Sequence, residues 1–562
     1  MGLWTRLRGR WGRSGRRLRA TAHQRFGYHD LRPGQQEAMT HLLNGRDVLL
    51  VMPTGGGKSA VYQVPALLLD GPAIVVSPLI ALQRDQVTGL LEADAGGAVA
   101  VNSTTSVAAG LEKVTAGDAT FVFLSPEQLA KPDVVERLAQ ARPSLIAIDE
   151  AHCVSSWGHD FRPDYLRLGK VIERLGHPPV VAMTATAAPN VREEIVDVLG
   201  LIEPAQIVRG FDRPNISLEV RRFVRAEDKS RALAEYAASS EGLGLVYVAT
   251  RKETEEYAAE LTGRGRRAEP YHGGMRATER SRVHDLFSRG EVDTVVATSA
   301  FGMGIDRPNV RYVLHAEPPE SPDAYYQEIG RAGRDGAPAA AVLFYRQEDL
   351  GLRRFFTGGR ADGELLLRVA TLVRRHAGTV PAGELAALLE VSTSYLTRLV
   401  NLLERAGALS VTTTGDLRYA STGLTPERAA ARAVEQDEAR RRVDDSRIDM
   451  MRAYAETRGC RRRFLLEYFG EPYAPGRCDA CDICSSDDAP EPMPARGGEG
   501  FPVQAKVTHK MWGPGTVMSR EPDRITVLFD SVGYKTLSLA AVGDVLVHDL
   551  APASGRSQLH QD

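Results

Sequence analysis

Short apolar runs alternate with longer helical patterns over most of the first 345 residues, and this rhythm limits the possible folds more than any other feature. Strands that are buried on both faces read as continuous apolar runs, and parallel strands need a helical crossover between them. The alternation therefore predicts α/β architecture, with parallel sheets covered by helices. The expected strands are residues 47–52, 73–77, 120–124, 145–149, 180–183, 244–248, 294–297 and 312–315.

The chain has enough length for several such units, because 562 residues exceed the size at which single cores stop growing. A stretch rich in Pro and polar residues, 209–221, separates the two sets of expected strands. We predict a first lobe over residues 22–208 and a second over 209–350, with a cleft between them.

Smaller segments follow the two lobes. Residues 364–420 combine three helical patterns with a strand-turn-strand, as in a helix-turn-helix with a wing. Residues 425–485 are expected to form a helical, metal-binding subdomain, and residues 486–500 a linker. Short strands split by Gly turns over 501–550 predict a small β-barrel of the SH3 or Tudor kind, followed by a tail, 551–562.

Residues 1–21 are expected to be a basic arm without stable structure, or an over-extended start. The first twenty hold seven Arg and no acid, and they lack the apolar centre of a secretory signal. The formal net charge is only -2, so nucleic-acid binding would depend on local basic surface. We find no apolar run that could cross a bilayer, and the Cys residues are clustered, so we expect a cytoplasmic protein, nucleoid-associated if bacterial.

A glycine-rich turn, Thr54-Gly55-Gly56-Gly57-Lys58-Ser59, follows the first expected strand and precedes a helical pattern. Glycines there allow backbone N–H groups to approach phosphate oxygens at a helix N-terminus. Lys58 would reach the β- and γ-phosphates, and Ser59 would bind Mg²⁺. The turn predicts a nucleoside triphosphate site.

Two acids, Asp149 and Glu150, end the expected strand 145–149. Ligands of open α/β sheets bind at the carboxyl ends of the strands, so Asp149 can hold Mg²⁺ through its waters. Glu150 can orient and deprotonate an attacking water. Together with the glycine-rich turn, the pair predicts a hydrolytic site.

Further motifs lie in order around these two. They are Phe26-Gly27-Tyr28 with Leu31-Arg32-Pro33-Gly34-Gln35, an aromatic-rich stretch over 151–163, Thr184-Ala185-Thr186-Ala187, and residues 271–274, 297–306 and 325–336. In this order they resemble the RecQ family of superfamily-2 DNA helicases, over roughly residues 22–345 and 456–485. The resemblance implies two RecA-like lobes that close on ATP.

The resemblance also implies roles for single residues. Adenine recognition would use Tyr28, Arg32 and Gln35, and the nucleotide site would include Gln327. Arg334 would be the arginine finger that offsets charge in phosphoryl transfer, with Arg331 beside it on one helical face. The aromatic-rich stretch would couple single-strand contact to hydrolysis, with Trp157 and Phe161 able to stack on bases. The residues of this coupling group are Trp157, His159, Asp160, Phe161 and Arg162.

Four cysteines, Cys460, Cys478, Cys481 and Cys484, supply enough thiolates for a closed tetrahedral Zn²⁺ site of structural type. An iron–sulfur cluster also uses four Cys. The helical stretch 461–470 resembles the RecQ zinc subdomain, which favours zinc. Its three Arg, residues 461–463, could contact DNA backbone or be solvated.

The chain departs from the RecQ plan beyond the motor. RecQ proteins commonly carry a winged helix after the zinc module, often followed by a helical HRDC domain, whereas here the wing precedes the cysteines and no HRDC-like segment follows. The helix capped by Ser392 could contact DNA through Tyr395, Arg398 and Asn401, or pack on protein. The last domain resembles the small β-barrel of UvrD-type helicases and is a candidate docking site for a protein partner. Within it, Trp512 could be a core residue or a contact.

The expected function is an ATP-dependent 3′–5′ DNA helicase. Its DNA-stimulated ATP hydrolysis would drive unwinding of single-stranded and forked duplex DNA in recombination and repair. One alternative is a translocase that remodels nucleic acid without separating strands. The other is a non-enzymatic DNA-binding scaffold, disfavoured because Lys58, Asp149, Glu150 and Arg334 are all present.

Overall fold

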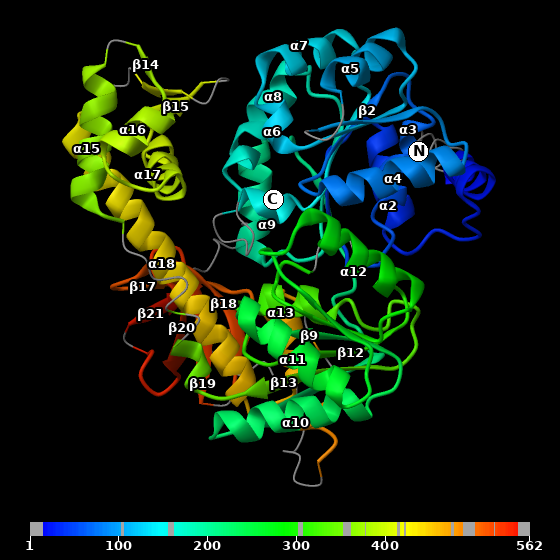
Figure 1. Cartoon of the computed structure of the whole chain (residues 1–562), viewed down its shortest axis with the longest axis vertical. Coiled ribbons are helices and arrows are strands. Elements are labelled where there is room, and N and C mark those ends of the chain that lie inside the picture. The colour runs from blue at the N-terminus through cyan, green and yellow to red at the C-terminus, as the bar shows by residue number, and fades with distance from the viewer. Residues whose placement is uncertain are drawn as a thin grey trace, which may run out of the picture.

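The computed structural model describes residues 15–102, 106–155, 162–301, 307–351, 354, 361–376, 378–412, 416–420, 423–471, 473, 477–486, 501–521, 523–543 and 545–548. Two α/β lobes lie against each other, and the winged helix and the β-barrel lie along one side of them (Figure 1).

Lobe 1 is built on a sheet of seven parallel strands in the order β3-β4-β2-β5-β6-β1-β7. Alternate residues of one strand enter opposite cores: Leu49 and Val51 pack on one face, Val48 and Leu50 on the other. Helices must therefore cover both faces. The strands are β1 Val48–Val51, β2 Ala73–Val76, β3 Ala98–Val101, β4 Phe121–Leu124, β5 Leu145–Ile148, β6 Val180–Thr184 and β7 Ala205–Val208. The helices are α2 Gln35–Leu43, α3 Ala60–Ala66, α4 Ile80–Glu92, α5 Val107–Ala116, α6 Pro126–Leu129, α7 Pro132–Gln140, η1 Ala151–Val154, η2 Pro163–Arg167, α8 Leu168–Arg174 and α9 Pro189–Leu199.

Lobe 2 repeats this plan with six parallel strands in the order β10-β11-β9-β12-β13-β8, which leaves β8 at one edge. The strands are β8 Ile216–Arg222, β9 Leu243–Tyr247, β10 Ala268–Tyr271, β11 Thr294–Ala297, β12 Val310–His315 and β13 Ala339–Tyr345. The helices are α10 Ala226–Ser239, α11 Arg251–Gly263, α12 Ala277–Arg289 and α13 Pro322–Ile329. The expectation of two parallel-sheet lobes is confirmed.

The winged-helix module has its own apolar core and a three-stranded antiparallel sheet in the order β14-β16-β15. Ser392 caps α17, because its Oγ accepts a hydrogen bond from Tyr395 N. The elements are α15 Gly363–Arg375, β14 Thr379–Val380, α16 Ala382–Leu388, α17 Thr393–Arg405, β15 Leu409–Val411 and β16 Leu417–Tyr419.

A single helix of 31 residues, α18 Pro426–Glu456, runs from the winged helix to lobe 2 (Figure 1). Its first part packs on α15 and α17, and its later part contacts α13 and α19 Arg461–Tyr468. The chain then forms the zinc module, which we define as residues 460–471, including α19, together with the cysteine loop 478–486.

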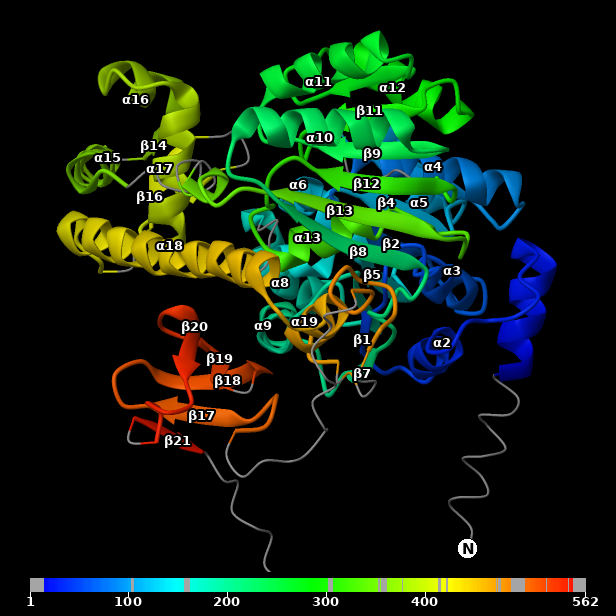
Figure 2. The same cartoon turned by 90° about the horizontal axis from the view of Figure 1, so that it is seen from below.

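The last domain is a five-stranded antiparallel sheet in the order β20-β19-β18-β17-β21, as expected for a small all-β domain. It packs on α18 and α19 (Figure 2). The approach is close, because a Cβ at Gly533 would lie 2.2 Å from Ser446 Oγ, and Tyr534 stacks on Tyr468 with ring centroids 5.5 Å apart. The strands are β17 Lys506–His509, β18 Gly513–Arg520, β19 Arg524–Phe529, β20 Gly533–Ser538 and β21 Leu546–His548.

The expected basic arm is partly wrong. Residues 15–26 form a helix, and Leu18 and Ala22 are buried in the core of lobe 1, since they supply an apolar stripe at helical spacing. The first fourteen residues lie outside the described ones. No helix within the described ranges combines the length and apolar character needed to cross a membrane.

Candidate nucleotide site and zinc centre

The glycine-rich turn lies between β1 and α3, where the close packing requires glycine. Gly55 and Gly57 both have φ of 76°, in the left-handed region. A Cβ at Gly57 would lie 2.6 Å from Gln35 Nε2, and one at Gly56 would lie 2.8 Å from Pro53 O. Lys58 Nζ donates to Met52 O at 3.3 Å. Thr54 precedes the glycines, and Ser59 is the N-cap residue of α3.

Two of the three residues expected at the adenine site lie against this turn. Gln35 Nε2 donates to Gly56 O at 3.2 Å and to Gly57 O at 2.9 Å, and Gln35 Oε1 accepts from Arg32 N at 2.7 Å. The Arg32 guanidinium donates to the carbonyl of Gly55. Tyr28 is 39% exposed and stacks on Phe26. Arg32 and Gln35 thus contact the glycine-rich turn directly.

The acidic pair follows β5 at the same edge of the sheet. Glu150 N donates to Asp149 Oδ1 at 3.0 Å, and the hydroxyl of Tyr165 donates to Asp149 O at 3.1 Å. Burial and the neighbouring Glu150 raise the pKa of Asp149 to about 6, and Lys58 acts in the opposite direction. Glu150 has a φ of 48°, which is uncommon for a residue with a side chain. A cation at this point would stabilise both carboxylates.

A chain of polar contacts connects Glu150 with lobe 2. His152 Nδ1 lies 3.2 Å from Glu150 Oε2 and 2.9 Å from Thr184 Oγ1. Thr184 Oγ1 donates to Thr186 O at 2.9 Å. Gln327 Nε2, from α13 of lobe 2, donates to Thr186 Oγ1 at 3.2 Å. The sequence motif around Thr184 therefore lies between the acidic pair and the second lobe.

Arg334 of lobe 2 packs on the glycine-rich turn of lobe 1. A Cβ at Gly55 would lie 3.3 Å from Arg334 Cγ and 3.4 Å from its Cδ. Arg331 is buried, at 7% exposed. The expectation that both Arg lie on one helical face is wrong, because α13 ends at Ile329 and the two residues occupy the turn that follows. Gly333, with φ of 55°, cannot be accommodated easily in a continuing helix.

The group expected to couple DNA contact to hydrolysis is described only at Arg162. Trp157, His159, Asp160 and Phe161 lie outside the described residues. Arg162 N donates to Cys153 O at 3.0 Å, and its guanidinium donates to Pro78 O at 3.4 Å. Arg162 is thus held beside the loop that follows β2.

Cys460, Cys478, Cys481 and Cys484 converge, with all four Sγ atoms within 4.8 Å of one another. Two backbone groups support them: Arg463 N donates to Cys460 Sγ at 3.5 Å and Cys484 N to Cys481 Sγ at 3.4 Å. Four thiolates with N–H donors fit a structural Zn²⁺ site.

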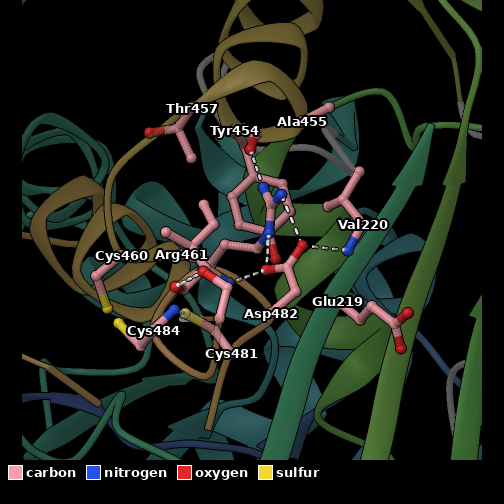
Figure 3. Close-up of polar contacts among 12 residues, drawn as sticks. Glu219, Val220, Tyr454, Ala455, Thr457, Cys460, Arg461, Cys481, Asp482 and Cys484 are labelled. Atoms are coloured by element: carbon pink, nitrogen blue, oxygen red, sulfur yellow. Dashed lines mark hydrogen bonds and ion pairs between the residues drawn. The ribbon is translucent and has the colours of Figure 1, made fainter. Parts of the chain in front are cut away.

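The cysteine loop pairs with β8 at the edge of the lobe 2 sheet through an isolated bridge between Leu218 and Cys481, and Figure 3 shows Asp482 between Arg461 and Val220. Leu218 N donates to Ala480 O at 2.9 Å, Asp482 N donates to Leu218 O at 3.0 Å, and Val220 N donates to Asp482 Oδ2 at 3.1 Å. The Asp482 carboxylate also accepts two bonds from Arg461, at 2.6 and 2.9 Å. The loop therefore covers a strand edge that would otherwise have unpaired backbone groups.

Both alternatives for the first two of the three Arg are wrong. Arg461 and Arg462 are 2% and 5% exposed, so neither is solvated or open to DNA. Arg461 also donates to Tyr454 O at 2.8 Å, and Arg462 pairs with Asp212 and donates to Ile216 O at 2.8 Å. A helical run of Arg predicts an exposed surface. Its burial here could be recognised only from its acidic partners, which are distant in sequence.

Helix α17 faces lobe 1 across a groove of about 700 Å³. Glu404 of α17 pairs with Arg167 of lobe 1, and Asn401 lines the groove. Arg398 lies 3.9 Å from Asp437 of α18. Of the three candidate DNA contacts of this helix, Asn401 thus lines the groove, and Arg398 lies near Asp437 while remaining partly exposed.

Trp512 in the β-barrel stacks on His509 at 4.1 Å and contacts Phe529 at 5.3 Å. It packs against the barrel core while remaining partly exposed. The neighbouring Met511 is 80% exposed.

Three family models match the chain. Residues 32–194 match the DEAD/DEAH box helicase model, residues 228–336 the helicase conserved C-terminal domain, and residues 422–485 the RecQ zinc-binding model. The third match supports zinc, not an iron–sulfur cluster, at the four Cys.

Similar proteins include helicases of bacteria. The probable ATP-dependent DNA helicase RecS of Bacillus subtilis is 34% identical over 481 residues, which cover 84% of this chain and 92% of the relative. The ATP-dependent DNA helicase RecQ of Pasteurella multocida is 41% identical over 58% of this chain, and the match spans 52% of that relative. Among solved structures, the DUF1998 helicase MrfA bound to DNA and AMPPNP has a similar fold, with a TM-score of 0.51 and 20% identity over 73% of this chain and 62% of that chain.

Proposed function

The chain belongs to the RecQ family of ATP-dependent DNA helicases, and from this premise we propose that it unwinds forked DNA in the 3′–5′ direction during recombination and repair. One observation carries the proposal: Arg334 of lobe 2 lies on the glycine-rich turn of lobe 1. A nucleotide at this turn would contact both lobes, so its hydrolysis would change how they close.

The residues of the turn are proposed to bind the triphosphate. Backbone N–H groups of Gly55 to Gly57 would hold the phosphates, Lys58 would bind the β- and γ-oxygens, and Tyr28, Arg32 and Gln35 would bind the base. Mg²⁺, when bound, neutralises phosphate charge, and Ser59 and Asp149 are the residues that fit it. Burial and Glu150 raise the pKa of Asp149, and a cation beside it would offset the cost of the charged carboxylate.

Glu150 is proposed as the general base for the attacking water. Its contact with His152 would fix its orientation, and the chain through Thr184 and Thr186 would report the state of the site to Gln327 in lobe 2. Arg334, with Arg331 beside it, would stabilise charge on the transferred phosphoryl group.

DNA is the proposed partner of the cleft between the lobes. Trp157 and Phe161, with His159, Asp160 and Arg162, are proposed to contact the strand and transmit its presence to Glu150. Stacking on such aromatic side chains contributes about 1–3 kcal/mol per base. Arg162 supports this role, because it lies between the loop after β2 and the residues next to Glu150.

Phosphate release in the presence of single-stranded DNA tests the chemistry. We expect Arg334→Ala to lower kcat at least about 10³-fold, the lower end for removal of an arginine finger. Lys58→Ala should also abolish most of the ATP hydrolysis. Arg282→Ala is a matched control, because Arg282 is an exposed Arg of lobe 2 that pairs with Glu269. Wild-type hydrolysis in the Arg334 variant would reject the proposed site.

A translocase that does not separate strands is the second candidate. It is favoured by the direction of α17, whose Glu404 and Asn401 face lobe 1. Displacement of streptavidin from biotinylated single strands, compared with unwinding of forked duplexes, distinguishes the two. Displacement without unwinding would support the second candidate.

The β-barrel is proposed to bind a protein partner. Met511, at 80% exposed, lies in the turn between β17 and β18. Met511→Glu should weaken such a complex without changing ATP hydrolysis.

A further inference from the structure

We infer that Arg213 and Asn215, in the segment that joins the two lobes, are positioning residues for the arginine finger. The inference rests on the proposed function, because it assigns the means by which Arg334 is held at the nucleotide. The interlobe segment, residues 211–215, lies between β7 and β8. In the sequence it appears only as a polar, Pro-containing break.

Arg213 binds the turn that carries the finger through three backbone carbonyls. Its guanidinium donates to Gly330 O at 3.2 Å, to Ala332 O at 2.8 Å and to Gly333 O at 3.0 Å. A planar guanidinium with five donors can span these acceptors, whereas a Lys ammonium presents a single point of contact. Arg213 therefore fixes the backbone on both sides of Arg331.

Asn215 holds the other side of the same turn. Its Nδ2 donates to Gly333 O at 2.8 Å and to Ala337 O at 2.9 Å, so its two bonds bracket Arg334. The approach is close enough that a Cβ at Gly333 would lie 2.4 Å from Asn215 Nδ2. The backbone of Asn215 adds a third contact, since its carbonyl accepts from Ala339 N at 2.9 Å.

The turn that carries the finger is not helical, so contacts from outside it help to fix its shape. After α13 ends at Ile329, the chain continues in short turns, with bonds such as Ala332 N to Ile329 O at 3.0 Å, and Gly333 N donates to Val310 O at 2.9 Å. In this framework, Arg213 and Asn215 bind the carbonyls on either side of the two Arg. A guanidinium must lie within hydrogen-bond reach of the phosphoryl oxygens, and a displacement of about 1 Å can cost about 10²-fold in rate. Loss of the carbonyl contacts would loosen the backbone that carries Arg334 without removing Arg334.

The interlobe segment is itself held on its opposite side by the zinc module. Phe211 stacks on Phe469 with ring centroids 4.6 Å apart, and Phe211 N donates to Glu471 Oε2 at 2.8 Å. Arg462 pairs with Asp212. A cavity of about 20 Å³ lies where the segment, α13 and α19 meet, and Arg213 lines it; Arg213 is partly buried, and this burial lowers its pKa. Arg334 is thus positioned by the interlobe segment, which is itself held by the zinc module.

Steady-state ATP hydrolysis with saturating single-stranded DNA tests the inference in the full-length protein. We expect Arg213→Lys to lower kcat at least about tenfold, with the KM for ATP within about twofold of wild type, because the lost interaction acts on the transition state. Asn215→Ala is the milder variant and should lower kcat in the same way to a smaller extent. The control is Arg266→Ala: Arg266, also in lobe 2, donates to Ser240 O, Gly242 O and Tyr312 Oη, distant from the turn in sequence. It should lower the melting temperature but not kcat.

A double variant separates positioning from general stability. If Arg213 acts through Arg334, then Arg213→Lys should cause no further loss of kcat in an Arg334→Ala background. Losses that multiply, or an Arg213→Lys variant with wild-type kcat, would overturn the inference while leaving the proposed function intact. If the wild-type protein itself releases no phosphate with DNA and Mg²⁺, the proposed function fails, and the inference fails with it.

Discussion

The zinc module and the winged-helix module are both connected to α18, yet their contacts with the two lobes differ in burial and in backbone pairing. The zinc module pairs with β8 at the edge of the lobe 2 sheet, and Arg461, buried at 2% exposed, pairs with Asp482. The winged helix contacts lobe 1 through Arg167 and Glu404, whose side chains are 42% and 23% exposed, beside a groove of about 700 Å³.

The difference indicates which module the motor depends on. Removing one partner of a buried ion pair leaves an uncompensated charge, whereas an exposed pair contributes little. We therefore expect lobe 2 to lose structure without the zinc module, and to tolerate movement of the winged helix. Three predictions test this contrast and one tests the junction of the zinc module with the β-barrel, in order of decreasing effect.

Loss of a zinc ligand should give the largest effect. Cys481→Ser is expected to remove the metal and destabilise the β8 edge, since structural zinc sites contribute on the order of 10 kcal/mol. Zinc content and calorimetric unfolding measure the result. Cys153→Ser is the control, because Cys153 is buried in lobe 1, outside the four-cysteine cluster. Full zinc content in the Cys481 variant would contradict the assigned ligand.

Arg461→Ala should cost about 3–5 kcal/mol, because Asp482 would remain partly buried without its partner. Hydrogen exchange of the amides of Leu218 and Val220, which pair with the cysteine loop, reports the loss directly. Adding Asp482→Ala should restore part of the stability. Unchanged exchange in the single variant would remove the basis of the contrast.

Glu467 makes the junction between α19 and the β-barrel sensitive to pH. Burial raises its pKa to about 7 from the ordinary 4.5, opposed by Arg463 and reinforced by Glu521 of the barrel. The folded protein therefore binds this proton more tightly, so its stabilising contribution is present below about pH 4.5 and is lost as the pH rises to about 7. Glu467→Gln should stabilise the protein by about 1–3 kcal/mol at pH 8 and have little effect at pH 4.5. Equal melting shifts at both pH values would show that the carboxyl is not responsible.

Arg167→Ala should have the smallest effect on stability, below about 1 kcal/mol, since the pair it breaks is partly exposed. Its main result should be structural: fluorescence transfer between labels on lobe 1 and on α17 should report a wider groove. A loss of stability equal to that of Arg461→Ala would refute the contrast between the modules.

The sequence was sufficient to predict features that depend on local spacing. The convergence of the four Cys and the two parallel sheets followed from spacing and from the alternation of elements, whereas the choice of zinc over an iron–sulfur cluster needed the family resemblance. The expected strands did not include β3, β7, β8, β10 or β13. Edge strands such as β3, β7 and β10 are less fully buried, so their apolar pattern is weaker.

Other features depend on partners that are distant in sequence. Arg462 and Asp212 are 250 residues apart, so their burial could not be recognised from a run of three Arg. Arg213 was hidden for the same reason, since its carbonyl partners have no side-chain signal. The helix over residues 15–26 was missed because its surplus of Arg concealed the positions of Leu18 and Ala22.

Helix α18 is a long rigid arm between lobe 2 and the winged helix. Its 31 residues span about 46 Å at about 1.5 Å per residue. One end is fixed to lobe 2 through α13, and the other carries the winged helix. A rotation of lobe 2 by roughly 10° would sweep the far end through about 8 Å, a distance set by this length. A rotation of lobe 2 that moves its own residues by a few ångströms would therefore displace the winged helix relative to lobe 1 by about two base-pair steps, each about 3.4 Å.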